Sequence, residues 1–205
     1  SSTGLPLLLS CGMADLSEIS ASLNIVGAFD GYPTILLHTT SQYPTPVKDT
    51  NILKLKTLEN TFPNIPLGFS DHTQGSLASS LAVSFGACIF EKHFTLDQNF
   101  PGPDHWFSEN QESLKNWIDS IKKSYLMMGS GDLKPTNAEQ KMKILARRSI
   151  VALTDIKKDD ILDLQNIGMK RPGNGLPPKL FEEIIGKKTT RDLIKNELLK
   201  TGDYL

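Results

Sequence analysis

Two short motifs in this 205-residue chain each place a histidine after an apolar run. The first is FSDHT at 69–73, and the second is FEKHF at 90–94. Neutral imidazoles are common ligands of divalent metals, and two of them leave positions open for a substrate oxygen that the metal can polarise. His72 and His93 are therefore candidate metal ligands. The alternative is that each is a hydrogen-bonded histidine of the core.

Two carboxylates accompany the histidines. Glu91 stands two residues before His93, so the two side chains would point to the same face of a strand. Asp104 belongs to the loop FPGPDHWFS, whose glycine and prolines restrict the backbone. A carboxylate in this loop can bind a water or a substrate hydroxyl. The alternative is that Asp104 caps the helix that follows.

Four further polar residues are candidates for substrate binding. Ser10 and Ser70 end apolar runs, and together with the N-termini of the following helices they can hold a phosphate, or they can simply cap those helices. Tyr43 in SQYPTP precedes a rigid turn and serves either binding or packing. Arg171 in KRPGNGLP lies beside a Pro-Gly turn, where a guanidinium can bind a polar ligand with two hydrogen bonds or stay solvated.

The elements that must position these residues are short apolar runs separated by segments with helical spacing. The runs are long enough for buried strands and too short for helices; they span residues 5–10, 34–40, 65–70 and 87–94. Alternation of strand, polar loop and helix is typical of right-handed βα units on a parallel sheet. The candidate residues follow the carboxyl ends of these strands, where parallel α/β proteins place their sites.

Four βα units make half of an eight-stranded barrel and leave two exposed strand edges. We therefore expect an α/β fold in which residues 1–130 form the C-terminal half of a (β/α)8 TIM barrel whose first units are absent from this sequence. Composition predicts a linker at 131–144 and a small β-rich domain at 145–205. In that domain, DIKKDDIL from 155 and DLIKNELL from 192 repeat one pattern, which predicts two similar half-motifs.

Composition narrows the class of protein. Lys plus Arg total 22 and Asp plus Glu total 23, so a net charge of -1 favours neither nucleic acid nor an anionic membrane as a partner. Cys11 and Cys88 are expected as reduced thiols. No apolar run approaches the roughly 20 residues of a membrane span, and no leader is evident. These features predict a cytoplasmic protein.

Taken together, LSCGM, the QYP turn, GFSDHT, FEKHFTLD with PGPDH, and RPGNGLP resemble the sialic acid synthase family, in the family's order. The tail resembles the SAF domain, an antifreeze-like β-clip module. The resemblance implies condensation of phosphoenolpyruvate with an N-acetylated hexose such as N-acetylmannosamine. The products are a nine-carbon 2-keto sugar acid and phosphate, and the implied cofactor is a divalent metal, Mn²⁺ or Mg²⁺.

The resemblance also implies roles for individual residues. His72 and His93 become the metal ligands, while Glu91 and Asp104 orient water and substrate. Tyr43 lines the same pocket.

The remaining roles concern substrate contacts and assembly. Ser10 and Ser70 resemble residues that contact phosphoenolpyruvate. Arg171 resembles the arginine that the SAF domain of one protomer presents to the sugar in the barrel of its partner, which implies a domain-exchanged homodimer. Ser41 stands where bacterial members often have asparagine, so that polar contact is either altered or supplied by the serine.

The phosphate-binding lysines and an essential glutamate of the family belong to the first half of the barrel, so we expect no turnover from these 205 residues alone. Two alternatives remain open. One is a synthase for another sugar, such as legionaminic, pseudaminic or a spore-coat sugar. The other is a non-catalytic fragment whose SAF module binds a sugar or a partner.

Overall fold

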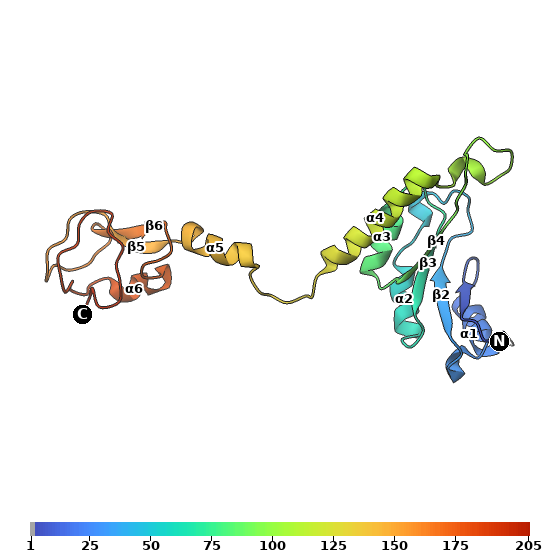
Figure 1. The fold of residues 1–205 in the computed structure, drawn as a ribbon. Coiled ribbons are helices and arrows are strands. Elements are labelled where there is room, and N and C mark those ends of the chain that lie inside the picture. The colour runs from blue at the N-terminus through green and yellow to red at the C-terminus, as the bar shows by residue number, and fades with distance from the viewer. Residues whose placement is uncertain (1–2) are drawn as a thin grey trace. The chain divides into compact units, whose positions relative to one another are not determined.

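A computed structural model describes residues 3–205, which divide into two compact units (Figure 1). The first unit ends at Gly131 and the second is Asp132–Leu205. Each unit has its own hydrophobic core. No helix in the described part of the chain is both long and apolar enough to cross a membrane.

The first unit is built on a parallel sheet with the strand order β1-β2-β3-β4. The strands are β1 (Leu7–Ser10), β2 (Thr34–His38), β3 (Leu67–Asp71) and β4 (Ile89–Lys92). Each lies within or overlaps one of the four predicted runs. The sheet stays open within residues 3–205, so the predicted βα repeat is confirmed, whereas a closed barrel is not formed by these residues.

A helix follows every strand, as the helical spacing predicts. The α-helices are α1 (Leu16–Ile25), α2 (Lys54–Thr61), α3 (Leu77–Ser84) and α4 (Gln111–Met128), and the short 3-10 helices are η1 (Ala28–Asp30), η2 (Val47–Asp49) and η3 (His105–Phe107). Helix α1 starts with a capping box, in which Asp15 and Glu18 each accept a hydrogen bond from the other's backbone N–H. Figure 1 shows α4 running alongside α3.

Strand alternation divides the sheet into two faces. Leu36, Leu67 and Phe69 pack with α1, α2 and α3 in the core of the unit. Because neighbouring residues of a strand point to opposite faces, Ser70 and Glu91 lie on the face turned away from these helices. We call this second face the inner face; it carries the residues predicted for chemistry.

The second unit is small and contains a two-stranded antiparallel sheet of β5 (Ser149–Ala152) and β6 (Ile167–Lys170) (Figure 1). Its helices are α5 (Asn137–Ala146), η4 (Pro178–Leu180) and α6 (Phe181–Ile184). Helix α5 lies largely within 131–144, the segment predicted as a linker. The two repeats pair through Ile156 and Leu193, whose backbone N–H groups each donate to the carbonyl of the other at 2.9 and 2.8 Å.

Candidate functional site

The two motif histidines lie side by side at the carboxyl edge of the sheet. The β3–β4 register pairs Asp71 with Lys92, the last residue of each strand, so the next residues, His72 and His93, become neighbours. The centroids of their rings are 5.2 Å apart and the ring planes are nearly perpendicular, at 83°. The structure therefore brings together the two predicted metal ligands.

The tautomer of His72 follows from its hydrogen bonds. Its Nδ1 lies 2.8 Å from the carbonyl oxygen of Thr40 and 3.3 Å from the hydroxyl of Thr39. A carbonyl only accepts, so Nδ1 carries the proton and donates it to Thr40. The lone pair of Nε2 stays available, which is the arrangement usual for a metal-binding histidine held by an outer hydrogen bond.

The surroundings of His93 favour its neutral form. Partial burial lowers its pKa, and the neighbouring His72 lowers it further, while Asp104 and Glu91 act in the opposite direction. The Asp104 carboxylate lies 3.8 Å from Nδ1 of His93. Asp104 precedes η3 but makes no capping hydrogen bond with its side chain, so the capping alternative is wrong.

Glu91 is fixed from the neighbouring strand. The buried hydroxyl of Ser70 donates to its carboxylate at 2.7 Å across the inner face. Tyr43 covers the histidines, with its ring centroid 4.4 Å from that of His72 and 5.7 Å from that of His93. About half of the surface of Tyr43 is exposed, so its ring packs on the two histidines and also faces solvent.

The donor chemistry of this site fits a divalent metal in part. Imidazole nitrogens bind zinc at about 2.0–2.1 Å, so the 5.2 Å between the two ring centroids is within the span that one shared ion would bridge. Within residues 3–205 no group of three or more His, Cys, Asp or Glu side chains converges as a metal cage. The described residues thus offer two imidazoles to such a metal.

The remaining predicted residues are Ser10, Ser41 and Arg171. Ser10 ends β1 on the inner face and is exposed. Ser41 packs against Gly12, where an added Cβ would lie 2.3 Å from the serine hydroxyl. Arg171 belongs to the second unit; it is exposed, and its Nε donates to the carbonyl of Ala146 at 2.9 Å. The predicted roles of these three residues stay predictions.

A buried ion network behind the histidines was missed by the sequence reasoning. Lys92 lies 3.2 Å from the carboxylate of Asp71 and 3.7 Å from that of Glu109. The signal was available, because both motifs place a charged residue directly before the histidine within an apolar run. Opposite charges at equivalent positions of adjacent strands predict a pair on the other face of the sheet.

Comparisons with known proteins cover both units of the chain. The NeuB family model matches residues 1–133 and the SAF domain model matches residues 147–205. The N,N'-diacetyllegionaminic acid synthase of Campylobacter jejuni is 41% identical over 95% of this chain and 58% of its own length. The pseudaminic acid synthase of the same species is 34% identical over 97% of this chain and 57% of its own.

A solved structure is also similar to this chain. The N-acetylneuraminic acid (sialic acid) synthetase of Leptospira borgpetersenii is 35% identical, with a TM-score of 0.61 over 68% of this chain and 48% of that chain. The chain thus spans about half to three fifths of the length of the relatives it matches.

Proposed function

Because this chain belongs to the NeuB family and carries a SAF domain, we propose that it forms part of an enzyme that condenses phosphoenolpyruvate with an N-acetylated hexose. The products are a nine-carbon 2-keto sugar acid and phosphate. The observation that carries the proposal is the pairing of His72 and His93 at the carboxyl edge of a parallel sheet, with two carboxylates beside them.

The relatives guide the choice of acceptor. A nine-carbon product made from three-carbon phosphoenolpyruvate requires a six-carbon acceptor. The identity to the legionaminic acid synthase exceeds that to the pseudaminic acid synthase of the same species. This favours a six-carbon acceptor with two N-acetyl groups, as in the product that the relative's name gives, with N-acetylmannosamine as the simpler alternative.

A divalent metal, Mn²⁺ or Mg²⁺, would be held by His72 and His93, and when bound it would supply a Lewis acid to polarise the aldehyde oxygen of the open-chain acceptor. The hydrogen bond from His72 to Thr40 keeps Nε2 free for this purpose. The lowered pKa of His93 favours its neutral imidazole, which is the form that binds a metal.

The other residues bind and orient the substrates. Glu91, held by Ser70, accepts hydrogen bonds from an acceptor hydroxyl or from the water that adds to the enol carbon. Asp104, whose carboxylate lies 3.8 Å from Nδ1 of His93, does the same. The ring of Tyr43 covers the histidines and excludes bulk water from one side.

The remaining assignments concern phosphoenolpyruvate and the second subunit. Ser10 and Ser70 contact phosphoenolpyruvate, and Ser41 supplies a polar contact to the same pocket. Arg171 of the SAF domain binds the sugar in the partner protomer of a domain-exchanged homodimer.

The test measures phosphate release from phosphoenolpyruvate with Mn²⁺ and either acceptor, using the intact gene product that contains these 205 residues. We expect metal-dependent release that His72→Ala abolishes. The control is Asn60→Ala on the exposed side of α2, away from the site, which should retain activity. Failure of every N-acetylated hexose, with sugar binding that needs no metal, would instead identify a non-catalytic binding module.

A further inference from the structure

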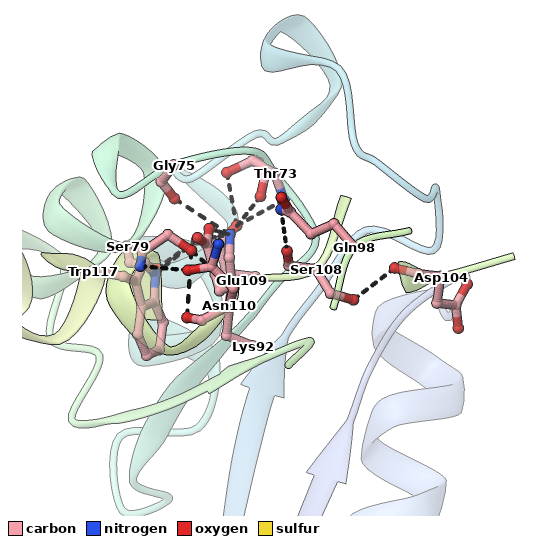
Figure 2. Close-up of polar contacts among 12 residues, drawn as sticks. Thr73, Gly75, Ser79, Lys92, Gln98, Asp104, Ser108, Glu109, Asn110 and Trp117 are labelled. Atoms are coloured by element: carbon pink, nitrogen blue, oxygen red, sulfur yellow. Dashed lines mark hydrogen bonds and ion pairs between the residues drawn. The ribbon is translucent and has the colours of Figure 1, made fainter. Parts of the chain in front are cut away.

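A buried cation lies directly behind the candidate site. The side chain of Lys92 is 3% exposed, and its Nζ forms ion pairs with Asp71 at 3.2 Å and Glu109 at 3.7 Å. The ammonium also donates to the backbone carbonyls of Thr73 and Gly75 (Figure 2). Lys92 follows the inner-facing Glu91, so it points to the opposite face from the histidines and does not reach their side of the sheet.

The Asp71 carboxylate is held as completely as the lysine. One of its oxygens accepts hydrogen bonds from the backbone N–H and the hydroxyl of Thr73, both at 2.8 Å. The other accepts from the hydroxyl of Ser79 at 2.6 Å, and Trp117 of α4 donates to that same hydroxyl at 2.9 Å (Figure 2). The network thus connects the end of β3 to α3 and α4.

Glu109 extends the network to the loop after β4. Its backbone N–H donates to the carbonyl of His93 at 2.9 Å, and its own carbonyl accepts from the N–H of Thr95 at the same distance. The preceding residue, Ser108, donates through its hydroxyl to the backbone carbonyl of Asp104 at 2.6 Å (Figure 2). A shift of Glu109 would therefore move both the His93 backbone and the loop that carries Asp104.

We propose that Lys92 is a positioning residue, whose charge holds Asp71 and Glu109 together and thereby fixes His72, His93 and Asp104 relative to one another. Asp71 and Lys92 are register partners, and each immediately precedes one histidine. The inference rests on the proposed function, which gives the positions of the histidines a role. The contacts of the network itself are all made by residues of this chain.

The charge balance explains why a lysine is needed. Buried ion pairs contribute little to stability compared with apolar side chains of similar size, but removal of one partner leaves an uncompensated charge. Without Lys92, two buried carboxylates would face each other and repel, and the loop carrying Glu109 would be displaced from β4. The expected consequence is a loosened histidine pair in a protein that is still folded.

The test compares Lys92→Met with Leu58→Ala, which opens a cavity in the core of the same unit away from the network. Two quantities are measured on folded protein: Mn²⁺ affinity from the electron paramagnetic resonance signal of free Mn²⁺, and hydrogen exchange of peptides spanning 94–110. We expect Lys92→Met to weaken Mn²⁺ binding by about 10-fold or more and to speed exchange in 94–110. Leu58→Ala should leave both unchanged.

A rescue variant separates charge from packing. Lys92→Met combined with Glu109→Gln restores the net charge of the network and leaves Asp71 with its hydrogen-bond donors, so we expect Mn²⁺ affinity and exchange to recover most of the loss. Lys92→Gln, which removes the same charge but keeps a hydrogen-bond donor, serves where Lys92→Met fails to fold, with the same two readouts and the same expected direction.

The outcomes are distinct. Unchanged exchange and Mn²⁺ affinity in folded Lys92→Met would overturn the inference, and so would a double variant as impaired as the single one. Absence of Mn²⁺ binding by the wild-type protein would contradict the metal assignment of the proposed function, while the exchange of 94–110 would still decide whether Lys92 positions the loop.

Discussion

Asp155 and Asp192 occupy equivalent positions in the two repeats of the second unit, and each caps the turn of the other. Asp155 accepts from the backbone N–H of Lys195 at 2.7 Å, and Asp192 accepts from that of Lys158 at 2.8 Å. Lys158 and Lys195 both stand three positions after the aspartate of their own repeat. The two repeats are therefore linked pseudo-symmetrically, because each donates a backbone hydrogen bond to the aspartate of the other.

This symmetry predicts that removing either aspartate side chain lowers the stability of the second unit by a similar amount. Asp155→Ala and Asp192→Ala should each lower the midpoint of thermal unfolding of the second unit by a few degrees, because each leaves one turn N–H without its acceptor. Glu182→Ala, an exposed carboxylate on α6, is the control and should change the midpoint little. A loss confined to one aspartate would contradict the equivalence.

The same repeats share a left-handed residue, since Asp159 and Asn196 both have φ of 69°. Because left-handed backbone costs an alanine about 1 kcal/mol or more, Asp159→Ala should reduce the free energy of unfolding by roughly that amount. Asp159→Gly should not reduce it, since glycine adopts this conformation without strain. Urea denaturation of both variants distinguishes a backbone effect from loss of the carboxylate.

Gly68 in β3 is required by close packing. A Cβ there would lie 2.3 Å from Cδ2 of Leu37 and 2.7 Å from the carbonyl oxygen of Ile89, and the latter atom belongs to the backbone of the next strand. Gly68→Ala should therefore lower the free energy of unfolding of the first unit by about 2 kcal/mol. Asn60→Ala on the exposed side of α2 is the control, and equal stability of the two variants would refute the argument.

His38 makes the stability of the first unit depend on pH. It is 1% exposed, its Nε2 donates to the carbonyl of Thr50 at 2.9 Å, and its Nδ1 has no hydrogen-bond partner among the described residues. Burial lowers the pKa of His38 from its ordinary value of 6.5. The unfolded chain therefore takes up a proton at higher pH than the folded one.

The direction of this pH dependence follows from the linkage between proton binding and folding. The stability that neutral His38 contributes is present above pH ~6.5 and is lost as the pH falls toward the folded-state pKa, by at most about 1.4 kcal/mol per pH unit. Urea denaturation of the wild type and of His38→Gln between pH 7.5 and 5.5 isolates this contribution. We expect the difference between the free energies of unfolding of the wild type and His38→Gln to become smaller as the pH falls. A difference that stays constant with pH would show that protonation of His38 does not affect stability.

Ser70 should matter for turnover more than for metal binding. Ser70→Ala removes the hydroxyl that donates to Glu91 at 2.7 Å, and the carboxylate then loses its fixed orientation. We expect about a 10-fold lower kcat, or ~1.4 kcal/mol, with unchanged Mn²⁺ affinity. Ser84→Ala, which removes an exposed hydroxyl of α3, is the control. Equal kcat in the two variants would show that Glu91 needs no such support.

Much of the first unit could be predicted from the sequence, because apolar runs too short for helices mark its strands and the polar residues follow directly after them. The pairing of His72 with His93 followed from the same reasoning. The Lys92 network did not, since a charged residue within an apolar run is read as exposed unless strand alternation is applied to both motifs together.

Helix α5 was also missed, because the glycine and proline content of 131–144 dominated the interpretation. The local signal was a capping box, since Thr136 accepts from the N–H of Glu139 and Glu139 accepts from that of Thr136. Arg171 belongs to the second unit and the histidines to the first, so the local sequence pattern could not predict where Arg171 lies relative to them.

The open sheet of the first unit has a practical consequence for handling the protein. Within residues 3–205, β1 and β4 each present one side of unpaired backbone N–H and C=O groups. Such edges accept any extended peptide, including the same strand of another molecule. Recovery of these 205 residues from denaturant should therefore fall as protein concentration rises, and a peptide that pairs with either edge should protect them from aggregation.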